Sequence, residues 1–394
     1  MDGKPKVLIL HNEYLQPGGE DLVLANERQL LEAHDHKVEV RTRSNTEIGG
    51  AFSKLKVAWQ LPYSDEGRHW AARQIAEVGP NVVHVHNTFP LLTPAVYDAC
   101  ADAGVPVVLT LHNYRYICAN GLFLRDGGPC EDCLGASPYQ AVTHRCYRDS
   151  KLGSLSLARL IAHHQKRGTW RSKVNRFVAL TEFARSKFVA AGFPQEKVAV
   201  KPNFVASTEA AVGAPRAGAL FVGRLAAEKG IATMMQAWRS LDVPLRVLGD
   251  GPLAGLVKGF GNPAVEPLGW RSSDEVADEM RRAGFLVMPS EWYEGFPLTL
   301  VEAFSRGLPV LASGIGGMAE VVEDGVTGLH FAPGDVGDIV EKVAWAAGHP
   351  DEMRRMGENA RRAYERLYSA EANYDMLQAI YDAAVEDRKL QTGG

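Results

Sequence analysis

The chain has 394 residues, of which 46% are hydrophobic and 23% charged, and its formal net charge is −4. These values are normal for a globular protein and give no support for nucleic acid as a partner, because nucleic-acid-binding surfaces are strongly basic. No stretch approaches the ~18 apolar residues of a membrane-spanning helix, and the VLIL run near the N-terminus is too short for the core of a signal peptide, so we expect a cytoplasmic protein.

Short β-branched segments alternate with helical stretches through the first half of the chain. The first strand is followed by a glycine-containing loop and by an apolar-periodic helix over residues 22–33. The strands predicted in this half are 6–10, 38–44, 81–87, 105–113, 176–181 and 197–203. Because these strands are almost continuously apolar, the alternation predicts a parallel sheet that is buried on both faces.

Residues 204–217 are small and polar without periodicity, and we predict that they form a linker. The alternation then restarts and gives way from about residue 335 to a charged, mostly helical tail. The strand-containing segments predicted here are 218–225, 244–252, 265–270, 285–290, 309–313 and 328–335, and the helices are 229–240, 273–283, 298–306 and 317–323. The sequence therefore predicts an α/β protein with two doubly wound, Rossmann-like parallel sheets and a cleft between them.

Two cationic side chains follow the first strand of the second half. In the segment GRLAAEKG, Arg224 lies at the strand end and Lys229 at the start of the next helix. Open α/β sheets bind ligands at the carboxyl ends of their strands, and guanidinium and ammonium groups are good partners of phosphate oxygens. The segment predicts a phosphate site, with two solvated surface cations as the alternative.

Two carboxylates flank the start of a helix in the segment EWYEGFPLTLVEAF. Helix N-termini favour bound phosphate, so the backbone amides near Leu300 and Val301 are predicted to hold a phosphate group. Glu302 would accept two ribose hydroxyls, and Glu294 would bind sugar hydroxyls beside Gly295, where the backbone can approach the ring closely. A nucleotide-sugar fits this set. The alternative is that both glutamates are solvated helix flanks.

The strand end at 265–270 gives a weaker indication. Leu268 and Trp270 would face the nucleotide base, through backbone contacts or by stacking of the indole. A tryptophan in the core explains Trp270 at least as well. The loop GDGP at 249–252 also ends a strand, but alone it is weak evidence.

In these motifs the chain resembles the glycosyltransferases of family 4, the group 1 family, which have a GT-B fold. The resemblance covers nearly the whole chain and also includes the segment GGMAEVVEDGVTGLHFAPGD. Its other motif residues are Gly223–Arg224 with Glu228–Lys229–Gly230, Glu294–Gly295–Phe296 with Glu302, and the loop Pro17–Gly18–Gly19–Glu20. It implies a retaining, hexosyl-type transferase that uses a nucleotide-diphospho-sugar and needs no metal for catalysis.

The resemblance also implies roles for the motif residues. Arg224 and Lys229 would bind the diphosphate, Glu302 the ribose, and the segment Glu294–Gly295–Phe296 the donor sugar. The motif positions assign acceptor binding to a domain over 1–203 and donor binding to a domain over 218–370. The C-terminal helix, 371–394, would cross back to brace the N-terminal domain.

Strand ends of the N-terminal half supply the remaining candidates. Gly18 and Gly19 follow the first strand, where their backbone could reach the diphosphate, and an ordinary turn is the alternative. His112 ends a strand and, by the resemblance, contacts the donor sugar, with a capping or core histidine as the alternative. His84 and His86 share one face of their strand, so His86, nearest the edge, is the candidate for acceptor binding.

The N-terminal half has no obvious carboxylate nucleophile at a strand end for a covalent intermediate. The resemblance implies a front-face route instead, in which the leaving diphosphate takes the proton of the acceptor. Arg224, Lys229 and the helix amides would stabilise the charge of the leaving group. We expect a polysaccharide or a lipid-linked glycan as the acceptor.

Four of the five cysteines crowd into the region 118–146, whereas Cys100 stands apart. Four thiolates suit a closed structural zinc site, and a disulfide framework is not expected in a reducing compartment. Buried thiols and a redox site are the alternatives. The four clustered residues are Cys118, Cys130, Cys133 and Cys146.

The segment 151–181 is basic and amphipathic. It carries seven Lys or Arg and no Asp or Glu, together with apolar residues that include Leu152, Leu157 and Ile161. Such a segment can lie on anionic lipid, which predicts peripheral binding at the inner face of the membrane. A solvated helix face is the alternative.

Two other functions fit the same motifs. A nucleotide-sugar epimerase of similar fold would convert the donor without an acceptor, and a non-catalytic protein would only bind it.

Overall fold

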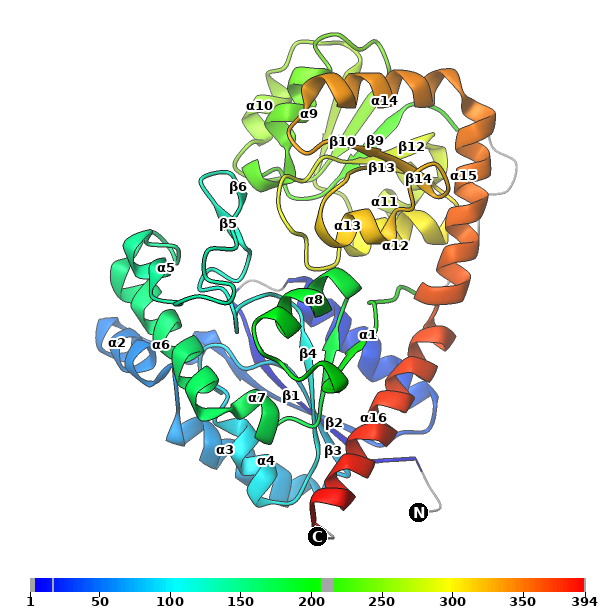
Figure 1. Ribbon diagram of the computed structural model, residues 1–394. Helices are drawn as coiled ribbons and strands as arrows, with labels where there is room; N and C mark the ends of the chain where they lie inside the picture. The colour runs from blue at the N-terminus through cyan, green and yellow to red at the C-terminus, as the bar shows by residue number, and fades with distance from the viewer. Residues whose placement is uncertain (1–3, 16–17, 207–215, 393–394) are drawn as a thin grey trace. The chain divides into compact units, whose positions relative to one another are not determined.

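The computed structural model describes residues 4–15, 18–206 and 216–392, which form two compact units (Figure 1). The N-terminal unit contains the described residues up to Phe123, Glu131–Asn203 and those from Asn373 onward. The C-terminal unit contains Leu124–Cys130 and the described part of Phe204–Ala372. Most of the predicted linker, residues 207–215, lies outside the described residues.

The N-terminal unit is built on a six-stranded parallel sheet in the order β2-β1-β3-β4-β7-β8, with helices on both faces (Figure 1). Its strands are β1 (Val7–Glu13), β2 (Val38–Ser44), β3 (Val82–Asn87), β4 (Val107–Leu111), β7 (Arg176–Ala179) and β8 (Val198–Val200). Its helices are α1 (Gly19–Ala33), α2 (Ala51–Gln60), α3 (Asp65–Val78), α4 (Val96–Asp102), α5 (Gln140–Thr143), α6 (Lys151–Arg167), α7 (Thr169–Ser172) and α8 (Glu182–Ala190).

The C-terminal unit has a second six-stranded parallel sheet, in the order β11-β10-β9-β12-β13-β14. Its strands are β9 (Ala219–Val222), β10 (Leu245–Leu248), β11 (Val265–Gly269), β12 (Phe285–Met288), β13 (Val310–Ser313) and β14 (Gly328–Phe331). The first strand, β9, lies between β10 and β12, so the direction of winding reverses there. Doubly wound sheets bind their ligands at such a reversal.

Helices cover both faces of this second sheet (Figure 1). They are α9 (Ile231–Ala237), α10 (Ala254–Lys258), α11 (Ser273–Arg282), α12 (Leu298–Ser305), α13 (Gly316–Val321), α14 (Val336–Gly348) and α15 (Pro350–Ala363). Successive residues of β9 belong to different core clusters, Ala219 and Phe221 to one and Leu220 to the other. This alternation is what a strand buried on both faces requires.

Several predicted boundaries differ from those of the structure, and two of the differences have identifiable reasons. The first strand does not end at residue 10, because His11, Asn12 and Glu13 continue the parallel pairing with β2. The helix predicted over 229–240 is shorter, since Gly230 adopts a φ of 68° and separates a 3₁₀ turn at Ala227–Lys229 from α9. A Cβ at Gly230 would lie 1.8 Å from the carbonyl oxygen of Pro289, so only glycine fits this turn.

The basic segment 151–181 does not form one continuous amphipathic surface, because it is divided among α6, α7 and β7. Leu157, Leu160 and Ile161 are buried in the core of the N-terminal unit, since their side of α6 covers interior apolar surface. Leu152, in contrast, is 73% exposed. The apolar side that was predicted to face lipid is therefore mostly core.

The last helix is α16 (Ala370–Thr392), and from Asn373 onward its described residues belong to the N-terminal unit. The hydroxyl of Tyr381 lies 2.9 Å from Nδ1 of His84, and Arg176 donates to the carboxylate of Asp387 over 2.9 Å. None of the described helices has the length and apolar content needed to cross a bilayer.

Candidate active site

Two candidates from separate motifs meet at the carboxyl edge of the C-terminal sheet. Lys229 follows β9 and Glu294 follows β12, and these two strands are neighbours. The Nζ atom of Lys229 donates to Oε1 of Glu294 over 2.6 Å, and Ser290 Oγ donates to the same oxygen over 2.6 Å. The Glu294 side chain is only 6% exposed, so the pair is shielded from water. The ammonium also lies 5.7 Å from the centre of the Trp292 ring.

The other predicted phosphate ligand, Arg224, lies at the surface. Its side chain is 65% exposed and forms an ion pair with Glu228, four residues further on. An exposed pair of this kind is weak, so a phosphate group could take the guanidinium from Glu228.

The loop GDGP, which alone was weak evidence, lies directly against the Arg224 segment. Leu225 donates its backbone N–H to the carbonyl of Asp250 over 2.9 Å. A Cβ at Gly249 would lie 1.9 Å from the carbonyl oxygen of Gly223, and one at Gly251 would lie 2.6 Å from that of Leu225. Glycine is therefore required here for close approach of two backbones, which a single sequence could not show.

The predicted anion site at the start of α12 has fewer open donors than expected. The backbone N–H of Leu300 already donates to the carbonyl of Pro297 over 3.1 Å, and the side chains of Leu300 and Val301 are fully buried. Glu302 lies one turn into the helix, and burial raises the pKa of its carboxyl group. Arg306 donates to the backbone carbonyl of Glu302 over 2.9 Å and opposes that shift.

The remaining C-terminal candidates differ in exposure. Phe296 is partly buried, and its ring centre lies 6.1 Å from that of Tyr368, whereas its neighbour Gly295 is partly exposed. Leu268 packs at the edge of the core. Trp270, directly after β11, is 73% exposed, so it is not a core tryptophan and its indole is open for stacking.

In the N-terminal unit, the strand-end histidines His112 and His86 form a buried row of polar contacts with Glu27. Nε2 of His112, after β4, lies 3.0 Å from Nδ1 of His86 at the end of β3. Nε2 of His86 lies 3.3 Å from Glu27 on α1, whose other carboxylate oxygen accepts from Lys201 over 2.6 Å. Burial, then the charge of His86, lowers the pKa of His112 well below its ordinary value. Burial would raise the pKa of Glu27, but the Lys201 ammonium and His86 outweigh it and hold that pKa well below the usual range.

His86 and His112 also line a cavity of about 20 Å³, which is room for one water molecule. Asn113 and Arg115 line it as well. The cavity lies at the carboxyl ends of β3 and β4, beside the reversal of winding between β1 and β3.

The glycine loop before α1 is more constrained than predicted. The N–H of Gly18 already donates to the carboxylate of Asp21 over 2.6 Å, and another oxygen of that carboxylate lies 3.0 Å from Nε2 of His11. Nothing lies within 4 Å of a Cβ placed at Gly18 or Gly19. The described protein therefore gives no steric reason for glycine at either position.

Two further polar residues near this loop, Asn113 and Arg115, were not predicted as site residues. Asn113 donates to Glu20 over 2.7 Å, and burial raises the pKa of Glu20 to about 7. Arg115 lies 4.3 Å from the Phe89 ring centre, and its buried Nε and Nη1 atoms have no hydrogen-bond partner in the described part of the chain. Asn113 and Arg115 follow β4, which was the available signal, but an asparagine or arginine at a strand end is too common to select alone.

The four clustered cysteines do not form a compact ligand set. Within the described residues, the group of three or more His, Cys, Asp or Glu that could hold a metal is Glu27, His84 and His86. Cys118 is buried and its Sγ lies 3.0 Å from Asn120 Oδ1, while Cys133 and Cys146 pack beside an apolar cluster that includes Leu157. The zinc site remains a prediction.

A separate cavity of about 1460 Å³ lies at the opposite, amino ends of the C-terminal strands. It is lined by Gly218, Pro244, Gly284 and Pro309, which directly precede four of the strands, and it contains none of the candidate residues. Its size does not make it the active site, because doubly wound sheets bind their substrates at the other edge.

Known families match both units. A family described as "Glycosyl transferase 4-like domain" matches residues 18–203, and one described as "Glycosyl transferases group 1" matches residues 213–363. The chain belongs to the group 1 glycosyltransferases. The motif residues Arg224, Lys229, Glu294 and Glu302 all lie within the second match.

Individual relatives match only part of the chain. An uncharacterized glycosyltransferase of Methanocaldococcus jannaschii is 32% identical over 167 residues, which cover 41% of this chain and 47% of that protein. The chain spans less than half the length of the first curated relatives that it matches.

Two solved structures confirm the GT-B fold of the chain. HepE of Anabaena in complex with UDP is 18% identical, with a TM-score of 0.65. The match covers 96% of this chain and 100% of the HepE chain. The lipopolysaccharide outer core galactosyltransferase WaaB, in its apo form, is 17% identical, with a TM-score of 0.66. The match covers 97% of this chain and 99% of the WaaB chain.

Proposed function

We propose that the protein is a retaining glycosyltransferase. It moves a hexose-type sugar from a nucleoside-diphosphate donor to an acceptor hydroxyl in the synthesis of a cell-surface polysaccharide or glycolipid. The observation that carries this proposal is the Lys229–Glu294 pair, which joins a cation and a carboxylate at the carboxyl ends of β9 and β12. Family membership, the UDP bound to HepE and the lipopolysaccharide role of WaaB support it.

Each group of the site has a task in this proposal. Lys229 has three donors, so it can keep one bond to Glu294 and direct another at a phosphate oxygen. Arg224 would add a planar pair of donors to the diphosphate. Glu302 would hold the ribose, Glu294 the donor sugar, and Trp270 would stack on the base.

The reaction needs no protein nucleophile. The bond between the anomeric carbon and the diphosphate oxygen breaks, and the acceptor oxygen bonds to that carbon on the same face. The acceptor proton passes to the departing diphosphate, and Arg224 and Lys229 stabilise the negative charge that develops there. These cations carry the charge that a metal would otherwise balance, so we propose that catalysis requires no metal.

Release of nucleoside diphosphate, measured with and without an acceptor glycan, tests the reaction. A thermal-shift screen against UDP-, GDP- and ADP-sugars first identifies the donor, because a ligand that binds the folded state raises its apparent stability. Release that requires acceptor supports transfer. Conversion of the free nucleotide-sugar would instead identify an epimerase, and binding without turnover a non-catalytic protein.

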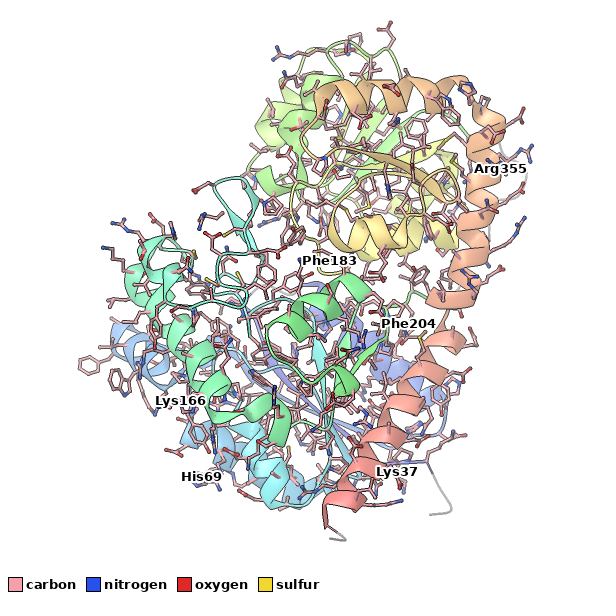
Figure 2. All side chains as sticks on the ribbon, in the orientation of Figure 1. Lys37, His69, Lys166, Phe183, Phe204 and Arg355 are labelled. Atoms are coloured by element: carbon pink, nitrogen blue, oxygen red, sulfur yellow. The ribbon has the colours of Figure 1, made fainter. Side chains whose placement is uncertain are left out.

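Substitutions test the assignment of the phosphate ligands. We expect Arg224→Ala and Lys229→Ala to lower transfer at least tenfold, because removal of one charge-stabilising donor commonly lowers the rate ~10²–10³-fold. Arg355→Ala is the matched control, since Arg355 is an exposed arginine of α15 that also pairs with a nearby glutamate (Figure 2). Turnover near wild type in either site variant would contradict the phosphate role.

A further inference from the structure

The helix α2 exposes its apolar side to solvent. Phe52 is 91% exposed, Leu55 65% and Trp59 70%, and α2 has no buried residue. Spacings of three and four residues place these side chains on one stripe of the helix. Such a stripe normally packs on the core. In α2 the stripe does not pack on the core. The residue that follows the helix, Leu61, is buried in the apolar cluster that includes Leu157.

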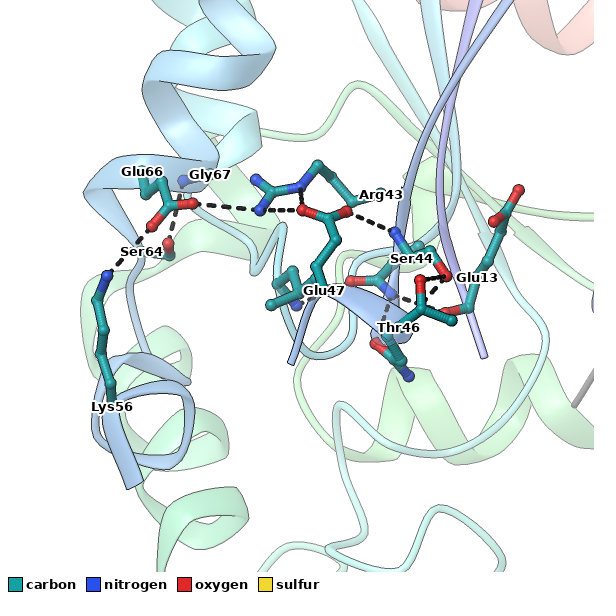
Figure 3. Close-up of polar contacts among 12 residues, drawn as sticks. Glu13, Arg43, Ser44, Thr46, Glu47, Lys56, Ser64, Glu66 and Gly67 are labelled. Atoms are coloured by element: carbon teal, nitrogen blue, oxygen red, sulfur yellow. Dashed lines mark hydrogen bonds and ion pairs between the residues drawn. The ribbon is translucent and has the colours of Figure 1, made fainter. Parts of the chain in front are cut away.

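Contacts at its flanks hold α2 in place without covering the stripe. Lys56 lies 3.4 Å from Glu66 of α3, which also pairs with Arg43 (Figure 3). The guanidinium of Arg159, on α6, lies 4.5 Å from the Trp59 ring centre. The helix is therefore attached at both sides, and its apolar side chains remain open.

The surroundings of the stripe are basic. Helix α2 carries Lys54 and Lys56 and no carboxylate, and it is in contact with α6, which carries four Lys or Arg and no carboxylate. On α6, Lys151 and Lys166 are exposed (Lys166 is labelled in Figure 2), and so is the apolar Leu152. Arg167 contributes less, because it pairs with Asp98 over 2.8 Å.

We propose that the stripe of Phe52, Leu55 and Trp59, with the basic residues of α2 and α6, docks the protein on an anionic lipid surface. A short helix with aromatic and leucine side chains on one side and lysines beside them has the composition of a helix that lies in the membrane interface. The lysines complement the negative headgroups, and the stripe enters the boundary between headgroups and acyl chains.

A second copy of the chain is a poorer occupant. Three such side chains can bury about 500 Å² in total, since a large aromatic side chain buries ~150–250 Å². A stable protein interface needs about 800 Å² from each partner. Lipid needs no such matching surface. The inference is independent of the donor chemistry, because α2 contains none of the residues assigned to the nucleotide-sugar.

Flotation of the full chain with vesicles tests the proposal. The protein should float with vesicles of phosphatidylglycerol and phosphatidylcholine at low salt, and not with phosphatidylcholine alone. The variant Phe52→Ser/Leu55→Ser/Trp59→Ser should lower the partition onto the anionic vesicles about tenfold or more. Leu390→Ser, at a leucine of α16 that is 71% exposed, is the control and should float like wild type.

A second variant reports the position of the helix itself. Trp59→Leu keeps the apolar stripe but removes its indole, so binding should persist while the vesicle-induced blue shift of tryptophan fluorescence decreases. Equal flotation of the triple variant and wild type would overturn the proposal. So would a wild-type dimer in sedimentation velocity that the triple variant loses, because the occupant would then be a second copy.

The same proteins separate this inference from the proposed function. The triple variant should keep the wild-type thermal shift with the donor nucleotide, since its three side chains lie at the surface and their loss leaves the fold intact. A failure of nucleotide binding in wild type would count against the proposed function alone, and a failure of flotation against the docking surface alone.

Discussion

The Nε2 atom of His112 lies 3.0 Å from Nδ1 of His86, and the other ring nitrogen of His86 faces the carboxylate of Glu27. The ionised carboxylate favours a proton on Nε2 of His86. In a neutral His86, Nδ1 must then accept the proton that His112 carries on Nε2. These contacts leave Nδ1 of His112 as a hydrogen-bond acceptor, and they fix the orientation of its ring.

Removal of His86 should therefore disturb the orientation of the His112 ring and leave nucleotide binding largely unchanged. We expect His86→Ala to lower kcat by about tenfold to 10²-fold, because a misplaced contact group has effects of that size. The KM for the donor should change little, since the diphosphate ligands are elsewhere. Steady-state kinetics with His112→Ala as the comparison check this, and additive losses in the double variant would exclude a coupled pair.

Glu20 should make stability depend on pH. Burial raises its folded-state pKa to about 7 from 4.5, so the folded protein binds the proton more tightly than the unfolded chain. The stabilising contribution of Glu20 is fully present below about pH 4.5 and is lost as pH rises through about 7, and its size is about 3 kcal/mol. We expect Glu20→Gln to be more stable than wild type at pH 8 and about equal at pH 5. Urea unfolding at both pH values measures the difference, and an identical difference at the two values would contradict the assignment.

The buried pair of Glu27 and Lys201 should control the stability of the N-terminal unit. Both side chains are at most 1% exposed, and Asn373 of α16 also accepts from the ammonium, over 3.0 Å. Lys201→Ala should lower the free energy of unfolding by about 3–5 kcal/mol, because it leaves a buried carboxylate without its counter-charge. Replacing both partners, as Glu27→Leu/Lys201→Met, should recover much of that loss. Denaturant unfolding provides the values, and a double variant as unstable as Lys201→Ala would show that the charge is not the cause.

The cysteine region gives a prediction about metal content. If Cys118, Cys130, Cys133 and Cys146 hold zinc, the purified protein contains about one equivalent, because structural sites of four thiolates bind zinc tightly. The matched comparison is Cys130→Ser/Cys133→Ser, which should lose the metal, against Cys100→Ser, which should keep it. Elemental analysis decides, and less than about a tenth of an equivalent in wild type ends the hypothesis.

The sequence predicted most of the strands and the order of the motifs, because apolar periodicity and strand-end glycines are local signals. It placed Arg224, Lys229 and Glu294 at the correct edge of the sheet for the same reason. It could not show that Lys229 and Glu294 touch, since that depends on β9 and β12 being neighbours. It also missed the contacts among His112, His86 and Glu27. It predicted an exposed apolar side for α6, which is mostly buried, and none for α2, because one sequence does not say which apolar helix covers the core and which is left outside.

The 2.6 Å bond between Lys229 and Glu294 means that, before any ligand arrives, the ammonium is already engaged. A bare anion must compete with Glu294 for that charge and offers the glutamate nothing in exchange. A glycosylated nucleotide brings hydroxyl groups that can satisfy the glutamate while its phosphates share the ammonium. Under the proposed function, the diphosphate that is left after transfer still shares the ammonium with Glu294, and this sharing should weaken the binding of the spent nucleotide.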